Sequence, residues 1–175
     1  MPVIPDATVK GTASNSYITV ARGNQLLTDT RLNVTGWNSA SDDDKARAVI
    51  YGTYLLDNVF MWHGTPRTIE QKLDWPRSGV YDNNGDDFDY DTIPEPLERA
   101  VAEMALQLLS RDRMSDPSLL GLGFSEAKVG SISVKVSEEM KVSLIPDYIT
   151  TVLHELGRPL VAASGGSGSV KLRRS

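Results

Sequence analysis

Apolar residues recur at helical spacing in four stretches of the 175-residue chain. The first predicts a short helix after Thr19, and the second a longer helix that begins at Ser41 or Asp42. The third and clearest stretch runs from two prolines at positions 94 and 96 to about Arg111, and the last follows Pro146 and ends near residue 157. The pattern predicts a mainly α protein, a small bundle of about four helices.

One stretch late in the chain changes to strand spacing. Between residues 128 and 136, Ile132, Val134 and Val136 alternate with polar residues. A lone strand is not stable, so it is expected to pair with residues 141–145, with another chain, or with both. The sequence therefore predicts a β-hairpin-like element near residues 128–145, and these three residues are candidates for a strand between subunits.

The two ends of the chain look irregular. We expect residues 1–161 to form one helical domain, because a chain of this length matches the usual size of a single domain. Residues 162–175 are rich in glycine and serine, which is typical of a flexible linker. The tail ends in a basic hook, for which a frayed terminus and a docking peptide remain equal alternatives; its residues are Val170, Lys171, Leu172, Arg173 and Arg174.

Charge is unevenly distributed along the chain. The formal net charge is -5, with 18 basic and 23 acidic residues, and three of the basic residues lie in the last five positions. The acids are densest in one loop that follows Trp75, where a solvated acidic surface is expected; its carboxylates are Asp82, Asp86, Asp87, Asp89 and Asp91. Because nucleic-acid affinity comes mainly from lysine and arginine, this balance argues against a dedicated DNA binder.

No motif of an enzyme or a cofactor site is complete. The chain has no cysteine, and His154-Glu155 lacks the second histidine that a zinc-peptidase motif requires. The acidic loop lacks the spacing of a calcium-binding loop, and no phosphate-binding glycine loop is found. We therefore expect no enzymatic activity, no metal and no cofactor.

No targeting or membrane segment is visible. The N-terminus has neither a basic nor an apolar leader region, and no run reaches the ~18 apolar residues that a membrane span needs. We expect a cytosolic product, or one that reaches the outside as part of an assembly. Three tryptophans, Trp37, Trp62 and Trp75, are expected to anchor loops to the core rather than to stack on bases, and Trp75 is expected to stack on Arg77.

A series of short motifs follows in a fixed order along the chain. They include Ser14-Asn15-Ser16-Tyr17, Tyr54-Leu55-Leu56-Asp57, Trp62-His63-Gly64 and Ile93-Pro94-Glu95-Pro96-Leu97. The most specific run contains Leu73, Trp75, Pro76, Arg77 and Gly79. Over residues 14–160 this order resembles the small head–tail connector (adaptor) proteins of tailed bacteriophages, a group often labelled DnaT-like single-stranded DNA-binding.

The resemblance implies a structural role. It implies a ring of about twelve copies under the portal protein, which extends the DNA channel and offers a docking platform to the next neck or tail protein. The partners would be the portal, that next protein, other copies of the chain, and double-stranded DNA that passes without specific binding. The protein would then reside at the head–tail junction of the virion, and in the host cytoplasm during assembly, with its C-terminal tail reaching toward the portal.

Two other functions remain open. The first is a single-stranded DNA-binding protein of replication, as the label of the family suggests, in which tryptophans would stack on bases and the tail would contact phosphates. The second is a small acidic regulator or nucleic-acid mimic that uses residues 82–103. The acidic charge of the folded part argues against the first function. Single-stranded DNA binding requires a basic groove, and an acidic folded part does not predict one.

Overall fold

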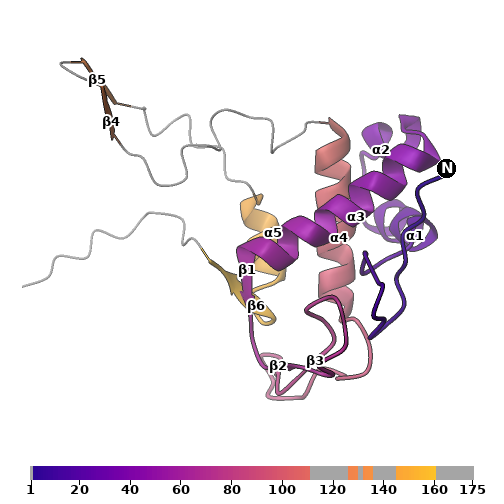
Figure 1. Cartoon of the computed structure of the whole chain (residues 1–175). Coiled ribbons are helices and arrows are strands. Elements are labelled where there is room, and N and C mark those ends of the chain that lie inside the picture. The colour runs from indigo at the N-terminus through magenta and orange to yellow at the C-terminus, as the bar shows by residue number, and fades with distance from the viewer. Residues whose placement is uncertain (1, 111–125, 130–131, 136–144, 161–175) are drawn as a thin grey trace, which may run out of the picture.

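The structure is a computed structural model that describes residues 2–110, 126–129, 132–135 and 145–160 (Figure 1). Helices α3 (Asp42–Val59) and α4 (Glu95–Ser110) cross at its centre. The interior side of α4 is fully buried, with exposures of 1% or less for Leu97, Ala100, Val101, Ala102, Met104 and Ala105. The mainly helical fold predicted from the apolar spacing is confirmed.

Close approach of α3 and α4 depends on a glycine. A Cβ atom at Gly52 would lie 3.4 Å from the carbonyl oxygen of Val101 and 3.5 Å from Cβ of Met104. Alanine would just fit at this position, whereas any longer side chain would force the two helices apart. Tight packing here joins the two longest helices into one core.

Helices α1 (Val20–Thr30) and α2 (Thr35–Ser39) lie together toward one end of α3, and α5 (Asp147–Val152) lies toward its other end (Figure 1). The predicted starts of two helices are confirmed. Thr19 accepts a hydrogen bond from the backbone N–H of Arg22 at 3.1 Å, and Ser41 accepts one from Asp44 at 3.2 Å. Three acidic residues in the first turn of α3 also stabilise the helix, because their negative charges lie at the positive end of its dipole.

Helix α2 was not predicted, because its five residues include Gly36 and its N-cap makes no side-chain hydrogen bond. The helix is held instead by Trp37, which is buried and donates from Nε1 to Asn24 Oδ1 at 2.7 Å. Gly23 of α1 makes room for this ring, since a Cβ there would lie 3.2 Å from it. The glycine that weakens α1 locally thus has a packing role.

Two short antiparallel pairs complete the described fold around the helices. Strand β1 (Phe60–Trp62) pairs with β6 (Gly157–Pro159), and β2 (Thr65–Pro66) pairs with β3 (Arg77–Ser78). The prediction that the last helix continues to residue 157 was therefore wrong. Gly157 pairs with Trp62 across the sheet, where a Cβ would lie 2.8 Å from the Met61 carbonyl oxygen, and Pro159 cannot continue a helix.

A separate hairpin is formed by β4 (Glu126–Val129) and β5 (Ile132–Lys135). The strand that contains Ile132 and Val134 was expected to pair with residues 141–145 or with another chain, whereas the structure pairs it with residues 126–129. Val136, and the tail residues 170–174, lie outside the described residues.

Candidate functional site

The motif residues around Trp75 come together on one side of α3. The Trp62 and Trp75 rings meet edge to face, with centroids 5.9 Å apart and planes at 85°. Phe60 stacks on Trp62, with ring centroids 5.0 Å apart and planes at 17°. The Trp75–Pro76 peptide bond is cis. These rings fasten the start of the loop at residues 75–93 to β1.

Arg77 holds this loop by its guanidinium. Its N–H groups donate to the carbonyl oxygens of His63 at 2.6 Å, Gly64 at 2.8 Å and Asp74 at 3.2 Å. The expected stacking of Arg77 on Trp75 is not what the structure shows, since backbone carbonyls occupy the donors instead. Burial lowers the pKa of Arg77, and the carboxylate of Asp74 offsets part of that shift. Arg77 and Gly79 thus have structural roles in the turn, and Gly79 has a φ of 74°.

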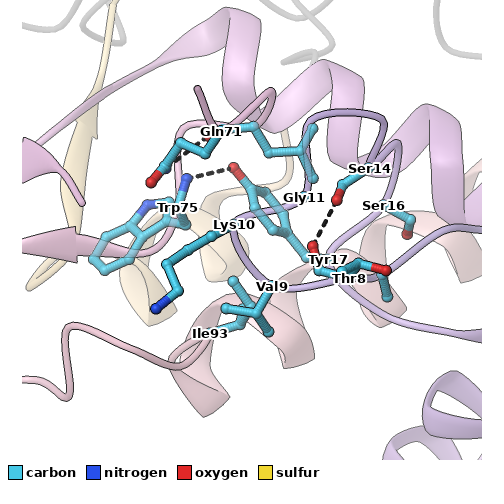
Figure 2. Close-up of a pocket in the computed structure, with 12 residues that line it drawn as sticks. Thr8, Val9, Lys10, Gly11, Ser14, Ser16, Tyr17, Gln71, Trp75 and Ile93 are labelled. Carbon is cyan, nitrogen blue, oxygen red and sulfur yellow. Dashed lines mark hydrogen bonds between the residues drawn. The ribbon is translucent and has the colours of Figure 1, made fainter. Parts of the chain in front are cut away.

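A buried polar contact lies behind the tryptophans. The hydroxyl of Tyr17 donates to Oδ1 of Asp57 at 2.5 Å. It also accepts from the backbone N–H of Trp75 at 3.2 Å (Figure 2). The backbone N–H of Asp74 donates to the second carboxylate oxygen of Asp57 at 3.4 Å. This contact joins the N-terminal segment, α3 and the loop that carries the Trp75 motif.

The pKa values of Asp57 and Tyr17 are both raised in this contact. Burial raises the pKa of Asp57 to about 7; the hydrogen bond from Tyr17 lowers it and the like charge of Asp74 raises it. Burial and the neighbouring Asp57 raise the pKa of Tyr17 well above its usual value, so the phenol stays protonated. Perturbed groups often mark functional sites, but structural networks produce the same shifts.

A cavity of about 10 Å³ lies beside this contact. Figure 2 shows the residues that surround it, which come from the N-terminal segment, Gln71, Trp75 and Ile93. The indole N–H of Trp75 is buried without a hydrogen-bond partner in the part of the chain that the structure describes. A space of this size holds about one water molecule, so it cannot accept a small-molecule substrate.

The acidic loop is partly used by the fold itself. Asp91 forms ion pairs with Lys10 at 2.8 Å and Arg67 at 3.4 Å, and Oδ1 of Asp82 accepts from the backbone N–H groups of Asn84 and Asp86. These contacts lower the pKa of both acids. Three carboxylates remain exposed and have no ion pair among the described residues; they are Asp86, Asp87 and Asp89.

The loop also contacts the turn that follows α5. The backbone N–H of Asn83 donates to Oε1 of Glu155 at 3.2 Å, and the Asn83 amide lies 3.3 Å from Nε2 of His154.

Within the described ranges, no group of three or more histidine and carboxylate side chains could hold a metal ion. Among those same residues, no helix is long and apolar enough to cross a membrane.

All three tryptophans lie in the core, as expected. Their exposures are 1% for Trp37, 7% for Trp62 and 1% for Trp75, so none presents a ring face on which a base could stack. The body formed by residues 2–110 and 145–160 contains 10 basic and 18 acidic residues. Most of these basic residues are already in ion pairs, so the described body offers no basic groove.

One polar cluster was missed by sequence reasoning. Glu103 of α4 is buried, and its Oε2 accepts from the Tyr148 hydroxyl at 2.8 Å and pairs with Nε of Arg31 at 3.1 Å. The guanidinium of Arg31 also lies 5.7 Å from the centre of the Tyr148 ring. The cluster joins the end of α1 to α4 and α5, although its three residues lie 45 or more positions apart in the sequence. A single acid within the apolar stripe of α4 was the only signal available.

Comparison with known proteins identifies the family. Residues 1–175 match the model of the family described as "Putative DnaT-like ssDNA binding protein". No curated protein and no solved structure matches the chain. Because the match covers the whole sequence, the chain belongs to this DnaT-like family.

Proposed function

We propose that this member of the DnaT-like family is a structural, non-enzymatic subunit of the head–tail junction of a tailed phage. It would form a ring under the portal, extend the DNA channel and provide the docking platform for the next neck or tail protein. The resemblance of the sequence to connector proteins supports this role. The Trp75 and Tyr17 motifs that carry the resemblance also build one packed framework. A framework of this kind sets the shape of a subunit and leaves its outer surfaces for assembly.

The observation that carries the proposal is a pair of different exposed surfaces near opposite ends of α3, one around a hollow and one on the β1–β6 pair. A closed ring built by head-to-tail contacts needs two distinct patches on each subunit. At about 1.5 Å per residue, the 18 residues of α3 separate its ends by roughly 27 Å. The separation lets each copy contact one neighbour at either end.

The first surface is a hollow near the start of α3. It has a volume of about 550 Å³ and lies between the end of α1, helix α2 and the end of α4. Leu32 at its rim is fully exposed, and Leu106 lines it while remaining buried. The exposed side chain of Leu32 beside this hollow makes it our candidate for one of the two contact surfaces.

The second surface lies at the end of α3 and on the β1–β6 pair. We call it the β1–β6 patch; its exposed members are Met61 and Leu160, and Tyr54 is exposed on α3. The Leu160 backbone N–H donates to the carbonyl oxygen of Val59 at 2.7 Å, which extends the β1–β6 pairing. Met61 pairs with Arg158, two residues before Leu160, so alternation along the strand gives Met61 and Leu160 the same face.

The charge of the body also suits a channel component. An acidic surface repels phosphate, so DNA can pass without being retained. The exposed acids of the loop at residues 82–89 are candidates for such a lining.

Single-stranded DNA binding is the second candidate function, and the description of the family favours it. Buried tryptophans cannot provide the stacking, so in this case Tyr54, which is exposed and stacks at 6.2 Å on Tyr51, would be the candidate platform. The three basic residues at positions 171, 173 and 174 would supply phosphate contacts. This function predicts binding that weakens steeply with salt and is lost when residues 162–175 are removed.

Mass measurements on surface variants test the ring. We expect the wild type to form a ring, alone or on the cognate portal, and Leu32→Asp and Met61→Asp to prevent it. Ile69→Asp is the matched control, because Ile69 is almost fully exposed but belongs to neither surface. Ring formation by Leu32→Asp and Met61→Asp would contradict the surfaces, and a wild type that stays monomeric with portal but binds single-stranded DNA at physiological salt would favour the second function.

A further inference from the structure

The β1–β6 patch carries a positive charge. Arg158 pairs with Met61 across the two strands, so their side chains share the exposed face of the sheet with Leu160. A guanidinium nitrogen of Arg158 lies 3.5 Å from Sδ of Met61. Among the described arginines, Arg158 alone has neither a carboxylate within ion-pair distance nor a backbone carbonyl as an acceptor. This face therefore presents an unpaired guanidinium beside two apolar side chains.

The hollow toward the other end of α3 has an acid beside it. Asp29 is exposed in the last turn of α1 and precedes Thr30 and Arg31, which line the hollow. The last turn of a helix is the negative end of its dipole, so an acid there is unfavourable unless a cation lies near it. In the described ranges no lysine or arginine forms an ion pair with Asp29, and Arg31 is paired with Glu103. A cation from another molecule would stabilise this position.

We propose that Asp29 of one copy and Arg158 of the adjacent copy form an ion pair across each interface of the ring. This inference rests on the proposed function and names the contact that sets the direction of assembly. The two surfaces are complementary, because each presents an exposed apolar side chain, Leu32 or Met61, beside a charge of opposite sign. Helix α1 and the β1–β6 pair also lie toward opposite ends of α3 (Figure 1), as contacts between head-to-tail neighbours require.

The pair acts on the specificity of assembly more than on its strength. An exposed ion pair adds little to affinity, whereas like charges placed opposite one another oppose a contact strongly. In a head-to-tail arrangement Arg158 meets Asp29. In a head-to-head arrangement two Arg158 side chains, or two Asp29 side chains, would face each other and repel. The pair therefore favours a closed ring over a symmetric dimer, and assembly should weaken as the salt concentration rises.

Charge reversal in the full chain tests the pair, with ring formation followed by native mass spectrometry, alone and on the cognate portal. We expect Asp29→Arg and Arg158→Glu each to weaken ring assembly by about tenfold or more. Asp29→Arg places a favourable charge at the end of α1, so a lost ring would not reflect a lost helix. The matched controls, which should assemble like the wild type, are Asp89→Arg and Lys72→Glu. Both residues are exposed, form no ion pair among the described residues and belong to neither surface.

A mixture of the two variants distinguishes a contact between copies from one within a chain. When Asp29→Arg and Arg158→Glu copies alternate, every interface again joins opposite charges. An equimolar mixture should therefore form rings with equal numbers of both variants, although neither forms them alone, and the double variant should form rings by itself.

Three results would overturn the ion pair. Recovery by the double variant but not by the mixture would place the contact within one chain. Single variants that assemble like the controls would exclude the pair and leave the proposed ring standing. A wild type that forms no ring, alone or on the portal, would overturn the proposed function and the ion pair together.

Discussion

The Trp75 backbone N–H donates to the hydroxyl of Tyr17, which lies 58 residues earlier in the chain, at 3.2 Å. This bond and the contact of the Trp75 ring with Trp62 place the loop at residues 75–93 firmly against the helices. The most distinctive motif of the sequence is thus part of the core. Motif residues of this kind determine the shape of the subunit, whereas its contacts with other molecules must come from elsewhere on its surface.

The full set of donors on the Arg77 guanidinium should contribute to the stability of the fold. Lysine at this position keeps the charge but lacks the planar set of donors that reaches three carbonyls. We expect Arg77→Lys to reduce the free energy of unfolding by about 1–3 kcal/mol, measured by urea denaturation. Arg99→Lys is the control, because Arg99 forms one exposed pair with Glu95 and should lose less than about 0.5 kcal/mol. Equal losses would contradict the role of Arg77.

Gly64 should tolerate no side chain. Its φ is 65°, and a Cβ there would overlap the carbonyl oxygen of Ser78 and lie 2.8 Å from Cγ2 of Val80. Gly79 has a φ of 74° but nothing within 4 Å of its Cβ position, so Gly79→Ala measures the backbone strain alone. We expect Gly64→Ala to cost about 1–3 kcal/mol more than Gly79→Ala in thermal unfolding. Similar melting temperatures would show that this turn is less constrained than the geometry indicates.

The Glu103 cluster should behave as a unit. Glu103→Gln and Tyr148→Phe both remove part of the same contact, so their effects on stability should not add. A double-mutant cycle should give a coupling free energy of about 0.5–3 kcal/mol. The exposed Arg99–Glu95 pair is the reference and should give about 0.3–0.5 kcal/mol. Additive losses at Glu103 and Tyr148 would show that the two side chains act separately.

Tryptophan fluorescence should report a buried environment. Because all three rings are in the core, iodide should quench the native protein much less than the urea-unfolded protein. Addition of single-stranded DNA should leave the emission unchanged, since no tryptophan can stack on a base. Quenching by single-stranded DNA at physiological salt would contradict this and would favour the DNA-binding function.

Much of the helical framework could be predicted from the sequence, because apolar spacing and capping residues act locally. Thr19 and Ser41 form the expected caps, and the long stripe of residues 97–109 forms α4. The short elements could not be predicted in this way. Helix α2 exists because Trp37 packs against Gly23, and β6 exists because Gly157 fits against β1. Both depend on contacts between distant residues that no local pattern contains.

The same distinction applies to the candidate site. The tryptophans could be assigned to the core from their few basic neighbours, but the partners of Arg77 and Glu103 could not be foreseen. The raised pKa of Asp57 requires the burial and the neighbouring charge that only the folded chain brings together. The hollow and the β1–β6 patch were also unpredicted, because the exposure of Leu32 or Met61 depends on how the chain folds and is not visible in a local pattern.

Electron microscopy combined with mass analysis tests the central proposal most directly. The purified full chain would be examined alone and after mixing with its cognate portal. The proposed role predicts closed rings, or about twelve copies docked on the portal, with the Leu32 and Met61 surfaces of adjacent copies in contact. A chain that remains monomeric, ignores the portal and binds single-stranded DNA at physiological salt would contradict it.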